Sequence, residues 1–533
     1  MVSSSPAPPS ALPAQASAWA PLRHPVFRGL WIASVVSNVG TWVQNVGAAW
    51  LMSEISTPAL VALVQTATSL PVFFLALPAG ALADIVDRRR LMLWAQAWSL
   101  AAATLLGVLT LSNLVTPWGL LALTFAIGVG AAASTPAFQS VVPDVVPRAD
   151  LPAAVALSSV SLNIARALGP ALGGVLVAAY SPGLAFLVNA ASFLATLVVV
   201  WRWDGGPPRA RRMPEHLVTA MRSGLHYVRH APAMRAVNVR TATFIAGGSA
   251  LWALLPVRAQ RELGFDALGY GVLLGAIGAG ALAGAVWLPR LRARIGANRL
   301  AALGAVVFGA VTAGLGLIAQ PAALLALMGV GGVAWLGLMS TFNVAVQASA
   351  PAWVKARALA VYLLVFQGGS AFASAGWGVA AERLGVRGAL LLAAVVSAAS
   401  ALTMWRWPLA TAAADLDPAR HWPEPQTAVP VHDDRGPVLV TVEYQVAPDD
   451  VPAFRRAMQR LRAVRLRDGA TTWHVMVDAA DPARHVEVFF VDSWAEHLRQ
   501  HDRVTHADRE LEGAVRAFHR GAPPRVSHWL GGE

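Results

Sequence analysis

The sequence predicts an all-α polytopic membrane protein with twelve transmembrane helices in two six-helix bundles, followed by a small C-terminal α+β domain. The 533-residue chain is 56% hydrophobic and only 13% charged, whereas a soluble globular protein carries about 25% charged residues. Runs of about 20 mostly apolar residues, each long enough to cross a bilayer core, recur along most of the chain. Their number and length disfavour a large soluble protein with buried helices.

The predicted spans form two groups joined by a polar, basic loop. Residues 1–26 are expected to be a disordered tail, because they are rich in Pro, Ser and Ala and contain no signal-peptide pattern. The loop, residues 204–235, contains a predicted surface helix at 215–229. The first group, residues 27–203, covers about Phe27–Met52, Leu60–Ala83, Leu91–Leu111, Pro117–Val142, Leu151–Ala179 and Gly183–Trp203. The second, residues 236–407, covers about Ala236–Pro256, Tyr270–Leu288, Leu300–Ile318, Ala322–Ser349, Ala358–Ala381 and Gly388–Trp407.

The distribution of basic residues sets the expected orientation. With the N-terminus inside, the inner connections hold 20 Lys and Arg residues and the outer ones hold 4. Because cytoplasmic loops carry the excess of basic residues, this ratio places both termini and the central loop in the cytoplasm of a bacterial inner-membrane protein. The net charge of +12 is accounted for by topology and contact with anionic lipid, without a nucleic-acid partner.

The last part of the chain has a different composition. Residues 408–436 are predicted to be a linker, and residues 437–533 a soluble domain. Within that domain, strands are expected at about 438–446, 472–477, 485–491 and 525–529, with helices at 449–464 and 493–519. The order β-α-β-β-α-β is the ferredoxin-like plan.

A short charged hairpin separates the second and third spans. It reads Gly80-Ala81-Leu82-Ala83-Asp84-Ile85-Val86-Asp87-Arg88-Arg89-Arg90. A weakly similar segment occurs about 200 residues later, where Pro289 is followed by Arg290, Arg292 and Arg294 but by no acidic residue. Two similar six-span halves joined by a long loop are the plan of a rocker-type secondary transporter.

The hairpin resembles the loop between spans two and three of the major facilitator superfamily, although Ile85 and Asp87 depart from its pattern. Gly169-Pro170-Ala171-Leu172-Gly173-Gly174, late in span five, resembles the antiporter signature of that superfamily. Together with Trp42, Gln44, Asn45, Asn163, Arg166 and the C-terminal domain, these motifs resemble the transmembrane secretion effector branch, which includes enterobactin-exporter-like proteins.

This resemblance implies the major facilitator fold and two functional motifs. Asp84 is expected to latch the outward-facing state together with Gly80, Arg88, Arg89 and Arg90, although topology alone also accounts for the arginines. Gly169, Pro170, Gly173 and Gly174 are expected to serve as the antiporter-like motif, although small residues also suit ordinary helix packing.

Polar residues within the spans are candidates for a substrate cavity. Arg166 is a charge inside a predicted span, where an unpaired arginine is costly, so it is expected to face a cavity or find partners. The other candidates are Asn38, Trp42, Gln44, Asn45, Asn163, Gln347 and Gln367. Polar side chains also hold helices together, which is the alternative reading for each.

Acidic residues bear on energy coupling. Glu54 and Glu382 lie at outer edges of spans, Asp144 and Asp150 near inner ones, and none lies deep in a span. Proton coupling, with protons as a partner, therefore rests on the resemblance, while the sequence leaves facilitated movement or another ion open. No Gly-rich loop ending in Gly-Lys-Ser/Thr marks an ATP site.

The soluble domain offers few motifs. His497 and His501 lie four residues apart, a spacing that can bind metal, but surface histidines on an amphipathic helix are the favoured reading. The domain resembles antibiotic-biosynthesis monooxygenase-type domains. Trp473, His474 and Trp494 are candidates for lining a small pocket, but a core or dimer-interface role is the favoured reading. No cysteine is present, so thiolate chemistry is excluded, and no cofactor or metal is expected.

Three functions are compatible with these observations. The leading one is a non-enzymatic exporter of small drug-like or siderophore-like molecules, working by alternating access. The second is a transporter–enzyme fusion whose C-terminal domain modifies or senses the substrate. The third is a structural or sensory membrane protein. The transporter core is expected to be monomeric, with possible partners limited to small molecules, the bilayer and protons, and the C-terminal domain is able to self-associate.

Overall fold

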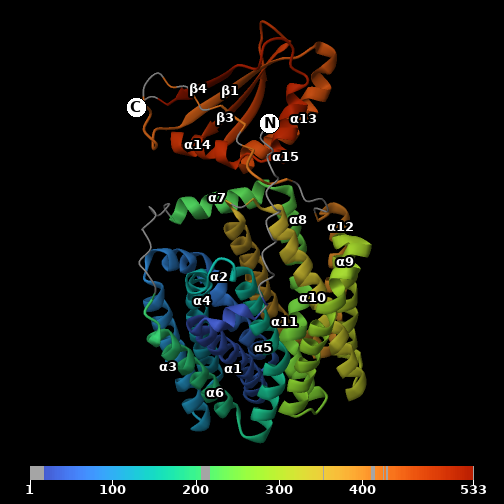
Figure 1. Ribbon diagram of the computed structural model, residues 1–533. Coiled ribbons are helices and arrows are strands. Elements are labelled where there is room, and N and C mark those ends of the chain that lie inside the picture. Colours follow the sequence, from blue (N-terminus) through green and yellow to red (C-terminus); the bar gives the residue numbers. More distant parts are fainter. Residues whose placement is uncertain are drawn as a thin grey trace, which may run out of the picture.

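The computed structural model describes a helical bundle capped by a small sheet domain (Figure 1). It covers residues 17, 19–205, 217–351, 353–409, 415–419, 421–423, 425, 427 and 430–531, and describes 76–77, 80–85 and 217–223 by their backbone alone. Most of the predicted N-terminal tail therefore lies outside the described residues. The sheet domain lies at one end of the bundle, here called the domain-side end, and the opposite end is called the far end.

Six helices make up the first half of the bundle. Proline in the first turn begins several of them, where its missing N–H costs nothing, and the Thr116 and Ser181 side chains cap two helix N-termini by accepting hydrogen bonds from Gly119 and Leu184. The helices are α1 (Pro25–Ile55), α2 (Pro58–Ile85), α3 (Arg88–Leu111), α4 (Pro117–Val145), α5 (Leu151–Ala179) and α6 (Pro182–Arg202).

The central loop contains the predicted surface helix, α7 (Leu217–His230), which lies between the bundle and the sheet domain (Figure 1). The second half then comprises α8 (Pro232–Val257), a π-helical turn (Arg258–Glu262), α9 (Ala267–Leu317), α10 (Pro321–Ser349), α11 (Lys355–Ala399), a 3-10 turn (Ser400–Leu402) and α12 (Thr403–Arg406). The long helices α9 and α11 are interrupted at Gly296 and Gly385, whose φ angles of 81° and 74° are left-handed.

Nine helical stretches among the described residues are long and apolar enough to cross a membrane. Helix α1 is not one of them, because polar residues such as Asn38, Thr41 and Gln44 lower its hydropathy. The interruptions in α9 and α11 fall within the connections predicted between spans eight and nine and between spans eleven and twelve. The predicted connections between these spans therefore coincide with the interruptions, although the structure joins each pair of spans into one interrupted helix.

The sheet domain follows the predicted order except at one helix. Its elements are β1 (Val438–Gln445), α13 (Val451–Arg467), β2 (Thr472–Val477), β3 (Arg484–Val491), α14 (Trp494–Arg503), α15 (His506–Arg516) and β4 (Val526–Leu530). The single helix predicted at 493–519 was wrong: Val504 and Thr505 are extended, and Thr505 forms a capping box with Asp508 that begins α15. The strands are all antiparallel in the order β2-β3-β1-β4.

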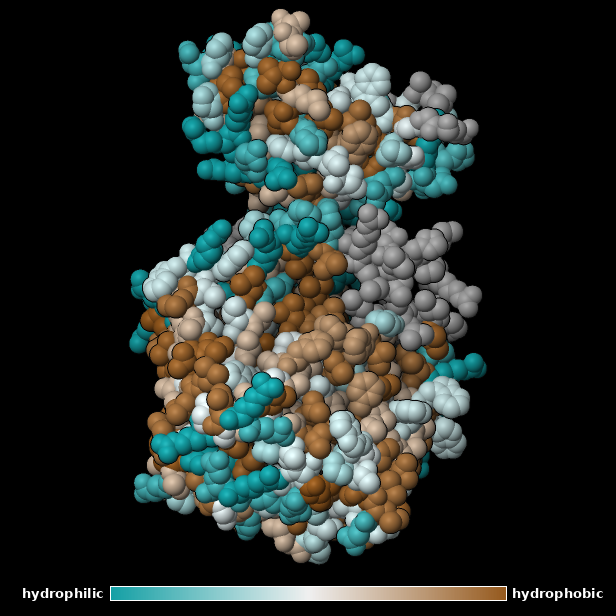
Figure 2. Space-filling model, turned by 180° about the vertical axis from the view of Figure 1, so that it is seen from behind, coloured by the Kyte–Doolittle hydropathy of each residue, from teal (hydrophilic) through white to brown (hydrophobic). Residues whose placement is uncertain are grey.

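The alternating pattern of β1 places Val438, Val440 and Val442 in the domain's own core, with Phe454 of α13 and Phe489 of β3. This core is separate from that of the bundle. The predicted linker contributes to the domain, because Pro418 bridges to Thr505. Apolar side chains gather on the bundle surface, and hydrophilic ones mark its junction with the sheet domain (Figure 2).

Candidate functional site

Hydrogen bonds join the two halves of the bundle at the far end. Arg261, just beyond α8, donates from Nε to the Ser53 carbonyl at 3.1 Å and also to the carbonyl of Ser56. Gln260 donates to the Glu54 carboxylate at 3.4 Å. The same carboxylate accepts a 2.7 Å bond from the Trp50 indole. Glu54, expected at the outer edge of span one, is thus shared between the halves.

The glycine motif of α5 serves two helix crossings. A Cβ at Gly169 would lie 2.4 Å from the Cβ of Trp42, so this face of α5 lies against α1. A Cβ at Gly174 would lie 2.9 Å from the Cα of Gly271 on α9. Gly173 also faces α1, at Val43. The motif therefore holds α5 close to its neighbour in the first half and to α9 in the second.

Two predicted cavity residues are held inside the first half. Asn38 donates to the hydroxyls of Ser34 and Ser161, both at 3.2 Å. Gln44 is buried and accepts from the Asn189 amide of α6. Gln44 thus makes a helix-to-helix bond within the first half, which is the packing role weighed against a substrate contact.

The remaining polar candidates have few long-range bonds. Asn163 is exposed and donates to the Ser159 carbonyl of its own helix. Gln347 donates to Asn343, one turn earlier on α10. Asn45 and Gln367 are half-buried, and neither has a hydrogen bond among the described residues.

Arg166 is half-buried in the middle of α5. Its guanidinium has no hydrogen-bond or ion-pair partner in the described part of the chain. Its carbonyl lies against α9, because a Cβ at Gly278 would stand 2.6 Å from it. Arg166 thus lies at the crossing of the two halves with a guanidinium that no described residue pairs.

An aromatic cluster that the sequence reasoning missed connects the halves. Trp42 of α1 lies 6.5 Å, ring to ring, from Trp252 of α8. Trp252 in turn lies 5.3 Å from Trp335 of α10, which also contacts Phe244 and Phe366. The sequence signal was tryptophan within apolar spans, but spacing alone does not show that these rings meet.

The arginines of the hairpin bind within the first half. Arg88 donates to the Ser140 carbonyl at 3.1 Å and to the Asp144 carboxylate at 2.8 Å, which ties α3 to α4. Arg89 donates to the Val200 and Trp201 carbonyls at the C-terminal end of α6, where unpaired carbonyls favour a cation. Arg90 is exposed. Gly80 and Asp84 lie in α2, and their side chains are outside the described residues.

Arg240 is a buried cation of α8, which the sequence reasoning counted only toward topology. It is 3% exposed and donates to Asn298 Oδ1 at 2.7 Å. Asn298 is also bonded in both directions to the backbone of Leu409, just after α12. This network fastens α8 to the middle of α9, just after its interruption at Gly296, and to the chain that follows α12.

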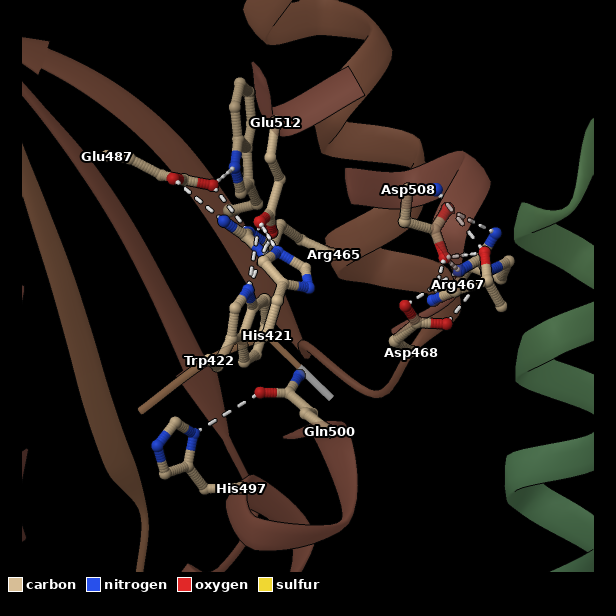
Figure 3. Close-up of polar contacts among 12 residues, drawn as sticks. His421, Trp422, Arg465, Arg467, Asp468, Glu487, His497, Gln500, Asp508 and Glu512 are labelled. Carbon is tan, nitrogen blue, oxygen red and sulfur yellow. Dashed lines mark hydrogen bonds and ion pairs between the residues drawn. The ribbon is translucent and has the colours of Figure 1, made fainter. Parts of the chain in front are cut away.

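A buried ionic network organises the sheet domain (Figure 3). Arg465 of α13 pairs with Glu487 at 2.9 Å and with Glu512 at 2.7 Å. Two residues of the predicted linker bond to the Glu512 carboxylate. Trp422 donates from its indole N–H, and His421 forms a hydrogen bond through Nε2. Burial opposes ionisation of Glu512, but Arg465 and these donors lower its pKa overall. The network therefore fixes residues 421–422 to the domain.

Three histidines meet beside this network. The Nε2 atoms of His497 and His501 are 3.4 Å apart, and the ring centroids of His497 and His528 are 4.7 Å apart. Burial, reinforced by the neighbouring histidines, lowers the pKa of His497 to about 3 and that of His501 to about 4. No group of three potential ligands among the described residues is arranged to hold a metal ion.

Two of the three residues weighed as pocket candidates in the sheet domain line a groove. Trp473 and His474 line a groove of about 420 Å³ between β2 and α13, together with Arg455 and Arg462. Trp494 does not line it and instead contacts His497 and His528.

The sheet domain contacts the second half of the bundle and α7. Arg467 lies 5.8 Å from the Tyr227 ring of α7. The Tyr227 hydroxyl donates to the Ser349 carbonyl at the end of α10, and burial raises the pKa of this tyrosine. Arg503 of α14 lies over Trp353, in the connection between α10 and α11.

Comparison with known proteins agrees with this architecture. The profile of the transmembrane secretion effectors matches residues 16–533. The chain is 25% identical to the staphyloferrin A transporter of Staphylococcus aureus (strain NCTC 8325 / PS 47) over 290 residues, which is 53% of this chain and 72% of that one. It is 27% identical to the multidrug efflux pump Tap of Mycobacterium tuberculosis (strain ATCC 25618 / H37Rv) over 289 residues, 47% of this chain and 66% of that one.

Solved structures share the fold of the bundle. The nucleoside transporter NupG superimposes with a TM-score of 0.58 at 12% identity, covering 72% of this chain and 99% of its own. A bacterial homologue of the human lysosomal transporter Spinster, inward-facing and occupied, gives 0.59 at 15% identity, covering 72% and 97%. The profile match spans nearly the whole chain, so this protein belongs to the transmembrane secretion effector family of the major facilitator superfamily.

Proposed function

We propose that this protein is a secondary transporter that exports small molecules of the drug or siderophore kind across the cytoplasmic membrane by alternating access. The observation that carries the proposal is Arg166, a half-buried cation on α5 at its crossing with α9, which has no partner among the described residues. The relatives named as a staphyloferrin A transporter and a multidrug efflux pump support this substrate class. An unpaired arginine in this place favours substrates that carry a negative group.

The proposed architecture has twelve spans. Helix α1 adds a span to the nine recognised by hydropathy. Helices α9 and α11 count twice because each is interrupted by a left-handed glycine. We place the domain-side end and both termini in the cytoplasm on the excess of arginine there. The sheet order β2-β3-β1-β4 supports a ferredoxin-like plan for residues 437–533, and the core is proposed to act as a monomer.

Alternating access requires junctions that open and close. The bonds of Arg261, Gln260 and Glu54 are proposed to seal the far end, while substrate reaches Arg166 from the cytoplasmic side. Opening would break these few bonds and separate the close glycine contacts between α5 and α9. If protons drive export, Glu54 is the acid we expect to respond.

The test is transport in inverted vesicles. Wild-type protein should accumulate a fluorescent anionic drug or a carboxylate siderophore, and Arg166→Gln should lower uptake of these compounds at least about tenfold. Uptake of a neutral or cationic compound should change far less. Arg166→Lys should retain part of the anionic uptake. Equal loss for all compounds would indicate a structural role for Arg166, and absence of any uptake by wild-type protein would contradict export.

A second role, in the sheet domain, is supported by the groove between β2 and α13. Arg455, Arg462 and His474 surround it, so a small acidic ligand is the chemistry that fits. We propose that the domain senses such a ligand, with chemical modification of the substrate as the alternative. Calorimetric titration of the full-length protein with transported compounds, against Arg462→Gln, tests binding, and product analysis tests modification.

A further inference from the structure

A second pocket lies at the domain-side end of the second half, away from the glycine crossing. It has a volume of about 390 Å³. Its walls come from the first turn of α8 and from the chain leaving α12, and include Pro232, Arg235, Ala236, Arg406, Trp407 and Pro408. The transport pathway proposed above does not use any of these residues.

Two arginines share one aromatic ring in this pocket. The guanidinium carbons of Arg235 and Arg406 are each 5.2 Å from the centroid of the Trp407 ring. Cation–π contact orients the two guanidinium groups and leaves their N–H donors free. Neither arginine has an acidic partner among the residues that the structure describes. Both arginines bring positive charge to the wall of the same pocket, and this charge favours an anionic ligand there.

The surroundings of the pocket are those of a membrane boundary. Helix α12 ends at Arg406, and the preceding Trp405 is 75% exposed. Tryptophan side chains at helix ends are typical of the interface between acyl chains and headgroups. The pocket's other walls are proline and alanine. Helix α12, beside the pocket, lies at the domain-side end of the bundle (Figure 1). The site therefore combines a cationic centre with an apolar wall.

We propose that this pocket binds the phosphate of an anionic phospholipid from the adjacent leaflet. The planar guanidinium groups of Arg235 and Arg406 would bind the phosphate oxygens in bidentate fashion, as arginine does with phosphate. The indole of Trp407 and the proline side chains would contact the glycerol and first acyl carbons. A free phosphate ion would satisfy the arginines but leave this apolar wall uncovered.

Lipid bound at this site would restrain the residues that follow α12 on the way to the sheet domain. Leu409, two residues after Trp407, is held by Asn298, which is also bonded to the buried Arg240. A lipid that fixes Trp407 would also steady Leu409 and, through Asn298, the contact between α8 and α9. Lipid composition would thereby influence how firmly the sheet domain is attached.

The test uses full-length protein in mild detergent, analysed by native mass spectrometry. Phosphatidylglycerol and phosphatidylcholine of equal chain length are titrated separately, and inorganic phosphate is added as a competitor. Wild-type protein should retain phosphatidylglycerol at least about tenfold more tightly than phosphatidylcholine. The double variant Arg235→Gln/Arg406→Gln should lose this preference. The matched variant Arg290→Gln/Arg294→Gln removes two arginines of α9 and should keep it.

Three results would overturn the assignment. One is a double variant that retains the preference, and another is a control variant that loses it equally, because either would indicate diffuse electrostatics. The third is displacement of phosphatidylglycerol by millimolar phosphate, which would identify a free-anion site.

Arg235→Lys/Arg406→Lys keeps the charge without the planar donors, so it should show an intermediate preference for phosphatidylglycerol. This variant also serves as a control for misfolding of the glutamine variant.

Discussion

The guanidinium carbon of Arg503, in the sheet domain, lies 4.5 Å from the centroid of the Trp353 ring, in the connection between α10 and α11. Arg503 is held from within its own domain by the Asp468 carbonyl, at 2.8 Å, and by Glu496. Trp353 in turn packs edge-on against Tyr227 of α7. A cation fixed within the sheet domain thus packs on one ring of an aromatic pair that is formed by the α10–α11 connection and α7. Movement of the α10–α11 connection would therefore disturb a contact that attaches the sheet domain.

Trp353→Ala is expected to loosen this attachment without unfolding either part. A cation–π contact of this kind stabilises by about 1 to 2 kcal/mol, so amide exchange in α7 and α14 should speed up by roughly tenfold. The control is Trp405→Ala, which removes a tryptophan that is 75% exposed on α12. Unchanged exchange in Trp353→Ala would show that other contacts hold the domain.

The charged hairpin yields a prediction that distinguishes a conformational latch from a set of charges that only fixes the membrane topology. Asp84→Asn should insert normally yet transport poorly, whereas Asp87→Asn should transport well, because Asp87 only caps α3 through the Arg90 amide. Arg88→Ala should lower transport severalfold by breaking its bonds to Ser140 and Asp144. Arg90→Ala should leave transport unchanged, since the Arg90 side chain is exposed. Vesicle uptake, normalised to inserted protein, measures all four. Wild-type uptake by Asp84→Asn would contradict the latch.

The glycine crossing between α5 and α9 offers an internal control. A methyl group at Gly271 would lie 2.7 Å from the Cα of Gly174, whereas one at Gly275, one turn away, would meet Ala171 at an ordinary 3.5 Å. Gly271→Ala should therefore cost about 1 to 3 kcal/mol through overpacking and shift the protein toward a state with the halves apart. Gly275→Ala should behave like wild type. Distances between spin labels at the far end of each half would show the difference.

The far-end junction predicts how transport depends on the proton gradient. Glu54 accepts hydrogen bonds from Trp50 and Gln260, and protonation would weaken it as an acceptor. Glu54→Gln should keep the fold but remove any dependence of uptake on the pH gradient. Asp266→Asn provides the comparison, since Asp266 caps α9 within the second half. If both variants keep the full pH response, the coupling ion does not act at Glu54.

Local signals in the sequence predicted much of this molecule. Apolar runs, prolines and basic turns located the bundle, α7 and the glycine motif, because these features depend on neighbours along the chain. The succession of strands and helices along the chain after Val438 was anticipated, apart from the division of the last helix. The comparisons confirm the family that the hairpin and Gly169–Gly174 indicated.

Pairings between distant residues were not predictable in this way. Gln44 bonds to Asn189, 145 residues away, and the sequence does not distinguish such a partner from a substrate. The Trp42–Trp252–Trp335 cluster and the Glu54 junction likewise depend on how the halves meet. The division of the last helix at Val504 follows from a capping box whose threonine also has to bridge to Pro418.

The histidine cluster predicts that the sheet domain weakens as the pH falls. The folded-state pKa values of His497 and His501 lie below the ordinary value of about 6.5. The unfolded domain therefore binds more protons between pH 6.5 and the folded pKa, and stability decreases through that window as the pH is lowered. From pH 7 to pH 5, His497 alone should remove about 2 kcal/mol.

Limited proteolysis of full-length protein in nanodiscs, compared at pH 7 and pH 5, measures this loss through cleavage within β1 to β4. His497→Asn should flatten the pH dependence, because asparagine does not titrate. His432→Asn, at an exposed position before β1, should leave it unchanged. Equal protease resistance of the wild-type domain at both pH values would mean that the three histidines already bind protons in the folded state, contrary to the burial that lowers the pKa of each.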